Sequence, residues 1–123
     1  MLFKEVVRTF DCSVICGHRG KAEQSRVFKY GTSALEFPNS LHNITPARAA
    51  DVVPYPLDWE DTNRFYFFGG FVLGVAARLY DEGIIDHRIR WGGDWDNDTE
   101  TRDQSFNDLP HFELAAPRHV YEV

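Results

Sequence analysis

Four polar residues, far apart along the chain, have the types and spacing of a metal-dependent active site. Asp108 and His111 stand three residues apart near the C-terminal end, and His42 and Asp51 stand in the first half. His42, Asp51 and His111 offer three protein ligands for one divalent metal ion. Three protein ligands with an open fourth position are typical of catalytic zinc, whereas structural zinc usually takes four. We therefore interpret the chain as an enzyme that binds Zn²⁺.

Asp108 adds an acid–base group to this predicted site. Catalysis by a metal that activates water needs a carboxylate to accept the proton and pass it to the leaving amine. A carboxylate three residues before a ligand, across a turn that contains Pro110, can lie beside the metal without binding it. The alternative is that Asp108 only forms the turn. The HExxH helix motif is absent, so a metallopeptidase would have to be of another type.

Asp51 stands in an apolar, β-branched segment, where an unpaired carboxylate would be costly and metal coordination would remove the cost. Asp58 and Asp61 are alternative carboxylate ligands. We interpret the three remaining histidines as ordinary polar residues: His18, His87 and His119.

Composition and charge narrow the class of protein. A length of 123 residues fits a single domain (1–123) that can bury a core. Hydrophobic residues make up 43% and aromatic residues 15%, as expected of a compact globular protein. The net charge is −6 and the basic residues form no stripe, which argues against a nucleic-acid partner.

The two cysteines and the apolar segments indicate in which cellular compartment the protein is made. Cys12 and Cys16, if on one strand, would be about 13 Å apart at roughly 3.3 Å per residue, beyond the reach of about 7 Å for a disulfide. We expect free thiols, with a Cys-x3-Cys metal pair as the alternative. Charged residues interrupt the first eleven residues, and the longest apolar run, 65–77, is too short to span a bilayer. We expect synthesis in the cytoplasm, without a signal peptide or membrane insertion.

Hydrophobic periodicity predicts an α+β fold, because strands and helices do not alternate regularly. We expect strands over 13–17, 49–53, 84–91 and 109–114, and helices over 21–30 and about 59–82. The second helix is apolar on nearly all sides between 65 and 77, which predicts extensive burial. Asp58 or Asp61 is its expected cap and Gly83 its end, and Gly70 and Gly74 would allow close approach of another element.

The segment 94–108 is a polar, acidic loop. An EF-hand loop would need Gly at its sixth position and Glu at its twelfth, where this loop has Thr99 and Ser105. We therefore expect a solvated loop, able to act as a lid over the cleft, and not a calcium site.

Taken together, these motifs resemble peptidase family M15, which includes D-alanyl-D-alanine peptidases and phage L-alanyl-D-glutamate endolysins. The resemblance extends over nearly the whole chain. It rests on Ser40-x-His42, Ala49-x-Asp51, Asp108-x-x-His111, Gly17-His18-Arg19 with Gln24, and Gly31-Thr32-Ser33. The segments 51–59, 91–95 and 108–114 are most similar to the small phage endolysins. Asp51 follows His42 by nine residues, two more than in the dipeptidase branch, and the endolysin branch shares the longer form.

The resemblance implies a Hedgehog/D,D-peptidase-type domain, with an antiparallel sheet flanked by helices and one zinc ion on His42, Asp51 and His111. It implies that Asp108 is the general base and that Arg19 stabilises the oxyanion of the reaction. Without the resemblance, Arg19 would be interpreted as a surface residue. Three further residues are candidates for contact with the substrate or the ligands: Gln24, Ser40 and Trp91.

The function that the resemblance implies is cleavage of the L-alanyl–D-glutamate bond in peptidoglycan stem peptides. The enzyme would be a monomeric phage endolysin that reaches the wall of a Gram-negative host through a membrane lesion. A D-alanyl-D-alanine dipeptidase or carboxypeptidase would use the same zinc chemistry. A zinc-retaining, non-catalytic binding domain is a third possibility, and the presence of both Asp108 and Arg19 weighs against it.

If Arg19 binds the developing oxyanion, Arg19→Lys should fail nearly as badly as Arg19→Ala, because lysine lacks the planar fork of donors. Losing one such donor costs about 10²–10³ in kcat. Zinc content, melting temperature and wall hydrolysis should be measured on both variants. Unchanged hydrolysis by Arg19→Ala would place the residue outside the active site, and a large fall in melting temperature would make it structural.

Overall fold

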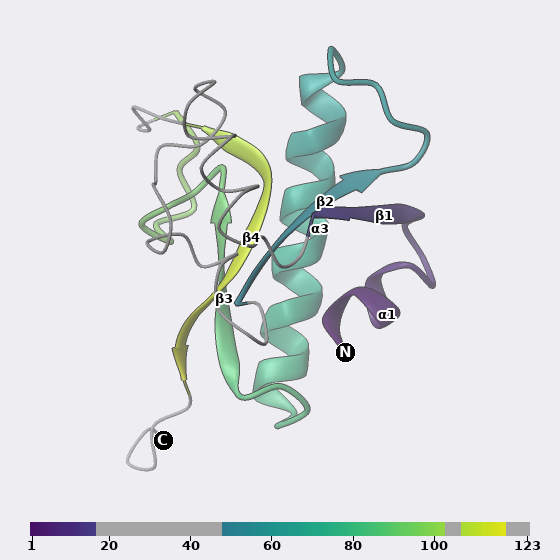
Figure 1. Cartoon of the computed structure of the whole chain (residues 1–123). Coiled ribbons are helices and arrows are strands. Elements are labelled where there is room, and N and C mark those ends of the chain that lie inside the picture. The colour runs from purple at the N-terminus through teal and green to yellow at the C-terminus, as the bar shows by residue number, and fades with distance from the viewer. Residues whose placement is uncertain (17–47, 103–106, 118–123) are drawn as a thin grey trace, which may run out of the picture.

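The computed structural model describes residues 1–16, 48–102 and 107–117 (Figure 1). Its elements in chain order are α1 (Leu2–Val6), β1 (Cys12–Cys16), β2 (Ala49–Pro54), α3 (Thr62–Asp81), β3 (His87–Gly92) and β4 (Asp108–Pro117). The predicted helix over 21–30 lies outside the described residues, as do Arg19 and His42.

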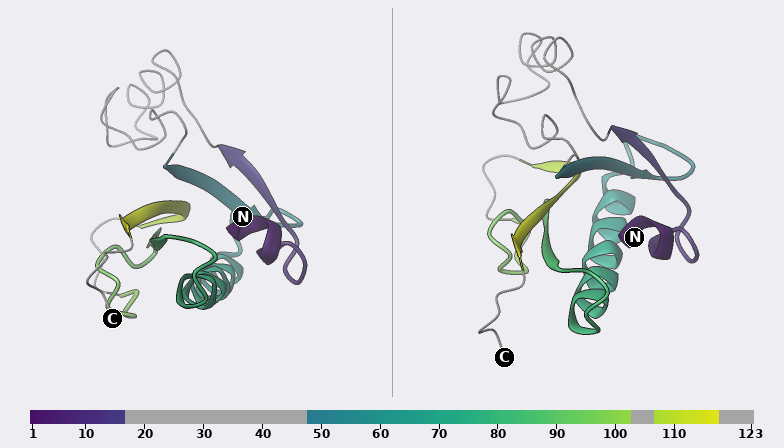
Figure 2. Two further views of the ribbon diagram at one scale, coloured as in Figure 1. Left: turned by 90° about the horizontal axis from the view of Figure 1, so that it is seen from below. Right: turned by 60° about the horizontal axis from the view of Figure 1, so that its bottom comes forward.

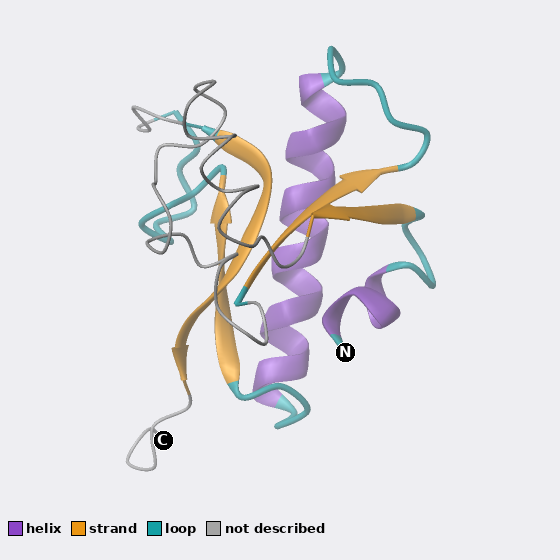
Figure 3. Cartoon of the chain, in the orientation of Figure 1, coloured by secondary structure: helices purple, strands orange, loops and turns teal. Residues whose placement is uncertain are grey.

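The four strands form one antiparallel sheet in the order β1-β2-β4-β3. The sheet is curved, and α1 and α3 lie on the same side of it (Figures 2 and 3). The α+β fold with a long central helix is therefore confirmed, as are the four predicted strands. Strand β3 begins three residues later than predicted, and the short helix α1 was not predicted.

The hydrophobic core lies between the helices and the sheet. Phe112 on β4 is 2% exposed and packs edge-on against Phe68 of α3 and Phe3 of α1, with ring centroids 6.0 and 5.5 Å apart. Trp91 on β3 stacks on the same ring at 6.4 Å. Burying an aromatic ring of this size stabilises the fold by about 2–3 kcal/mol. Phe112 thus fixes which side of β4 faces the helices.

Helix α3 begins and ends at the residues that the sequence indicates. The Asp61 carboxylate accepts a hydrogen bond from the backbone N–H of Arg64 at 3.2 Å, which makes Asp61 the N-cap. Gly83 follows the helix with φ of +77°, a conformation that favours glycine. The predicted extensive burial holds for the residues that face the sheet and α1, such as Phe65 and Phe68, but it does not extend around the helix, since Phe67 is 68% exposed. The sheet and α1 cover only one side of α3, and an apolar residue on the other side stays in contact with solvent.

The glycine that allows close packing on α3 is Gly69. A methyl group at Gly69 would lie 2.2 Å from Cζ2 of Trp91, whereas Gly70 and Gly74 are exposed and would meet no described atom within 4 Å. The prediction for Gly70 and Gly74 is therefore wrong, because helical geometry turns Gly69 toward the sheet.

Both cysteines lie on β1, as predicted, and Cys12 has a free thiol. Burial and the nearby Asp11 carboxylate raise the pKa of Cys12, so this thiol is less reactive than an exposed one. None of the described helices has the length and apolar character needed to cross a membrane.

We expect Gly69→Ala to destabilise the protein by about 1–3 kcal/mol, because the added methyl group overpacks the contact with the Trp91 ring. Gly70→Ala makes the same change at an exposed position of the same helix, where alanine should stabilise by up to about 1 kcal/mol. Thermal unfolding of the two variants should therefore move in opposite directions. Equal stability of both would contradict the Gly69–Trp91 contact.

Candidate active site

The pairing of β2 with β4 brings two of the predicted ligands together. Asp51 lies directly opposite His111 in the antiparallel register, and side chains directly opposite one another share a face of the sheet. Nδ1 of His111 lies 3.4 Å from Oδ1 of Asp51. The side chains are 11% and 21% exposed, so the pair is largely shielded from solvent.

Asp108 joins this pair through an irregularity in the pairing of β3 with β4. Trp91 is opposite Phe112, but the next residue, Gly92, is opposite Asp108. A side chain at Gly92 would collide with the backbone carbonyl of Asp108, so only glycine permits this approach. The indole N–H of Trp91 also donates a hydrogen bond to the carbonyl oxygen of Leu109 at 2.6 Å. These contacts fix the start of β4, where Asp108 stands.

The donor atoms of Asp51, Asp108 and His111 all lie within 4.8 Å of one another. Carboxylate oxygen and imidazole nitrogen are both ordinary ligands of Zn²⁺. The donor set therefore fits a divalent metal, and three of the four residues singled out in the sequence come together. The fourth, His42, lies outside the described residues, as does Arg19.

The two alternative carboxylate ligands have local structural roles. Asp61 caps α3, and the Asp58 carboxylate accepts the backbone N–H of Glu60 at 3.0 Å in the preceding turn. Because neither joins the cluster with His111, the suggestion that Asp58 or Asp61 replaces Asp51 is wrong.

The imidazole of His111 is held between carboxylates. Burial lowers its pKa, but hydrogen bonds to Asp51 and Glu113, with the charge of Asp108, outweigh burial and raise the pKa to about 9. Without a metal, His111 is therefore protonated at neutral pH. A metal ion would take the place of one proton in neutralising the surrounding carboxylates.

Glu113 and Arg90 extend the site along the sheet. Glu113 belongs to the segment 108–114 that resembles the phage endolysins and is the alternative base to Asp108, whereas no motif in the sequence pointed to Arg90. Glu113 stands two residues after His111, on the same face of β4, with Oε1 at 2.8 Å from Nε2 of His111. Arg90, its partner across the β3–β4 pair, donates two hydrogen bonds to Oε2 of Glu113 at 3.0 and 2.6 Å. Burial raises the pKa of Glu113, but its bonds to His111 and Arg90 outweigh burial and lower the pKa overall. Period-two alternation on β4 was the signal available in the sequence.

Comparison with known protein families shows to which family the chain belongs. The model of the family described as phage L-alanyl-D-glutamate peptidase matches residues 4–115. The chain belongs to this family. The resemblance to M15-type peptidases is therefore confirmed.

A solved structure is similar to this phage-peptidase family member in fold. It is the Serratia marcescens L-Ala D-Glu endopeptidase ChiX, with a TM-score of 0.67 and 24% sequence identity. The match covers 93% of this chain and 75% of ChiX. A search of curated proteins found no match. The similarity to ChiX confirms the fold.

Two tryptophans of the segment 91–95 lie close to the site of this peptidase. The sequence left two roles open for Trp91, contact with the substrate or support of the ligands. Trp91 is 2% exposed and belongs to the core, so it does not contact the substrate. Its hydrogen bond to the Leu109 carbonyl supports the start of β4, where Asp108 stands. Trp95 packs its ring on the His111 ring with centroids 5.5 Å apart. Trp95 therefore contributes to the surroundings of His111.

The acidic loop of the peptidase is organised by one of its own carboxylates. Asp94 is 4% exposed, and its oxygens accept the backbone N–H groups of Asp98 and Thr99 at 3.2 and 2.9 Å. Asp94, Asp96 and Asp98 lie close enough to hold a cation, but Asp96 and Asp98 are exposed, as in many solvated loops. Residues 94–99 of the loop are therefore held together by hydrogen bonds from backbone N–H groups to the Asp94 carboxylate.

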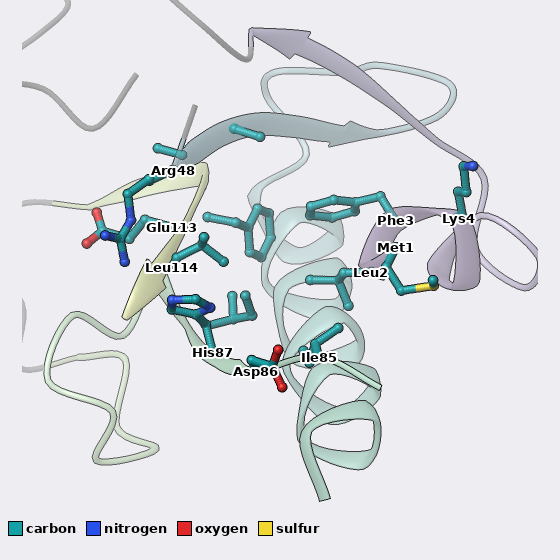
Figure 4. Close-up of a pocket in the computed structure, with 14 residues that line it drawn as sticks. Met1, Leu2, Phe3, Lys4, Arg48, Ile85, Asp86, His87, Glu113 and Leu114 are labelled. Atoms are coloured by element: carbon teal, nitrogen blue, oxygen red, sulfur yellow. The ribbon is translucent and has the colours of Figure 1, made fainter. Parts of the chain in front are cut away.

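A cavity of about 440 Å³ lies where α1 faces β3 and β4 (Figure 4). Leu2, Phe3 and Ile85 contribute apolar surface to it. Glu113 lines the cavity, but none of Asp51, Asp108 and His111 does. The cavity therefore adjoins the site at Glu113 and does not contain the candidate metal ligands.

The raised pKa of His111 predicts how the stability of metal-free protein depends on pH. A group whose pKa is raised by folding adds stability that is complete below its ordinary value of 6.5 and is lost as pH rises through about 9. In the presence of a chelator, the free energy of unfolding of wild type should exceed that of His111→Gln at pH 6. This difference should be about 3 kcal/mol larger at pH 6 than at pH 10. Denaturant unfolding at both pH values measures this, and a pH-independent difference would contradict the raised pKa.

Proposed function

We propose that this protein is a zinc-dependent peptidoglycan peptidase of the phage endolysin type, which hydrolyses the L-alanyl–D-glutamate bond of stem peptides. The observation that carries the proposal is the convergence of Asp51, Asp108 and His111 in a chain of the phage L-alanyl-D-glutamate peptidase family. The similarity in fold to ChiX, an L-Ala D-Glu endopeptidase, supports the same bond.

In this proposal His42, Asp51 and His111 hold one zinc ion. When bound, zinc supplies Lewis-acid polarisation of the scissile carbonyl and activation of water. Asp51 and His111 are supported for this role by their 3.4 Å separation and by their shielding from solvent. The Glu113 carboxylate lies on the Nε2 edge of His111, so the Nδ1 edge is the one directed at Asp51.

Asp108 acts as the general base of the proposed reaction. It accepts a proton from the attacking water and delivers it to the amine of the departing D-glutamate residue. The approach of β4 to Gly92 keeps its carboxylate within reach of the ligands. Arg19 is proposed to stabilise negative charge on the carbonyl oxygen.

The proposal includes the setting in which the enzyme acts. We expect a monomer that is synthesised in the cytoplasm of the host and reaches the peptidoglycan after release. Its substrate is a zwitterionic peptide, with which the net charge of −6 is compatible.

Mass spectrometry of purified peptidoglycan after digestion tests the substrate. The new ends should be a C-terminal L-alanine on the muramic acid side and an N-terminal D-glutamate on the released peptide. Release of D-alanine or D-alanyl-D-alanine would assign the protein to the alternative D,D-peptidase function. If zinc-loaded protein produced no new peptide ends, the result would favour a non-catalytic binding domain.

We predict that Asp108→Asn retains the metal and the fold but loses about 10²–10⁴ in hydrolysis rate, because the amide cannot accept the proton from water. His111→Ala is the contrasting variant, and it should lose most of the zinc as well. Zinc content by elemental analysis and wall hydrolysis should be measured together. Asp108→Asn acting at the wild-type rate would mean that another carboxylate is the base.

A further inference from the structure

The carboxylate of Glu113 connects two basic side chains in a line that ends at the proposed ligand His111. Its Oε1 lies 2.8 Å from Nε2 of His111, and its Oε2 accepts two hydrogen bonds from Arg90. Only 8% of the Glu113 side chain is exposed. A buried carboxylate is costly unless its oxygens are bonded. Because both oxygens are engaged here, the carboxylate is held in one orientation.

His111 presents its two ring nitrogens to different partners. Nε2 faces Glu113, while Nδ1 faces Asp51 at 3.4 Å. A neutral imidazole carries its proton on only one nitrogen, and the other nitrogen is then the one able to bind a metal. A carboxylate that accepts a hydrogen bond from Nε2 therefore selects the tautomer whose Nδ1 lone pair points toward Asp51.

We infer that Glu113 is a positioning residue of the metal site, which fixes His111 in the Nε2–H tautomer and turns Nδ1 toward the metal, while Arg90 holds the Glu113 carboxylate from the other side. The inference rests on the proposed zinc site and deepens it. Metal-binding histidines commonly donate their second N–H to a carboxylate, and removing that partner weakens metal binding about 10–100-fold.

The geometry favours this role for Glu113 over that of a general base. A general base must reach the water that attacks the substrate. Glu113 faces the edge of the imidazole opposite to Asp51, and its two oxygens are already bonded to His111 and Arg90. Asp108, whose donor atom lies with those of Asp51 and His111, is on the metal side of the ring.

Arg90 and Trp95 complete the support of the His111 ring. The Arg90 guanidinium carbon lies 5.4 Å from the centroid of the Trp95 ring, and Trp95 in turn packs on His111. One arginine thus fixes both the hydrogen-bond partner of the imidazole and the ring beside it. A cation above an aromatic face is itself a favourable contact.

The experiment compares the zinc affinity of wild type, Glu113→Gln and Glu82→Gln by competition with a chromophoric chelator. Glutamine has one oxygen and one N–H₂ group, so it cannot accept hydrogen bonds from both His111 and Arg90 as the carboxylate does. We expect Glu113→Gln to bind zinc about 10–100-fold more weakly. Glu82→Gln removes the same charge from a carboxylate that pairs with Arg78 at the end of α3, and its affinity should stay within about twofold of wild type.

A second measurement, ¹⁵N NMR of the histidine rings in zinc-loaded wild type, reports the tautomer without any substitution. His111 should show a protonated Nε2 with slow exchange and a metal-bound Nδ1, and Glu113→Gln should accelerate the exchange of that proton. A role of Glu113 in folding alone would leave the tautomer and the exchange unchanged. If Glu113→Gln does not fold, the spectrum of zinc-loaded wild type still tests the inference, because zinc on Nε2 of His111 or fast exchange of the Nε2 proton would contradict it.

Two results would overturn the inference, namely zinc bound to Nε2 of His111 or wild-type zinc affinity in folded Glu113→Gln. Both are independent of the substrate. Zinc-loaded wild type with the expected tautomer that leaves the L-alanyl–D-glutamate bond intact would contradict the proposed function and keep the role of Glu113. Failure of wild type to bind zinc would contradict both.

Discussion

The register between β2 and β4 is the constraint on which the site depends. Asp51 lies opposite His111 in that register, and Phe112 enters the core on the other face of the same strand. A slip of one residue would turn His111 and Glu113 toward α3 and Phe112 away from it. The rings of Phe3, Phe68 and Trp91 around Phe112 oppose such a slip. Core packing on one face of β4 therefore sets the chemistry on the other.

The electrostatics of the site follow from the same strand pairings. They place Asp51, Glu113 and Asp108 around one imidazole, and Arg90 beside the outermost of these carboxylates. Like charges at this spacing repel one another, and each loses solvation on burial. Protonated His111 offsets this charge in the metal-free protein, and a divalent cation would offset more of it. Clustering these carboxylates lowers the stability of the metal-free protein, but the same negative charge favours the binding of a divalent cation.

Much of the fold could be predicted because each element carries its own signals. Asp61 and Gly83 mark the ends of α3 by capping and by positive φ, and the β-branched run of β2 ends at Pro54. Which side of α3 is buried could not be predicted from its apolar composition, since only the placement of the sheet decides which side is covered. For the same reason Gly69, and not Gly70, meets Trp91.

The candidate site was predictable in part. Asp51, Asp108 and His111 were identified from residue type and spacing, and the structure brings them together. The contact between Glu113 and Arg90 was missed because it depends on which residues of β3 and β4 lie opposite one another. The choice between the two roles of Trp91 could not be made from the sequence, because only the packing of β3 against α3 shows that the indole is buried.

Anomalous diffraction at the zinc edge from crystals of the zinc-loaded protein would locate the metal. We expect one peak per chain, about 2.0–2.1 Å from Nδ1 of His111 and about 2.0–2.2 Å from a carboxylate oxygen of Asp51. Asp108 should lie beside the ion without replacing either ligand. A peak among Asp94, Asp96 and Asp98, with none at His111, would contradict this expectation.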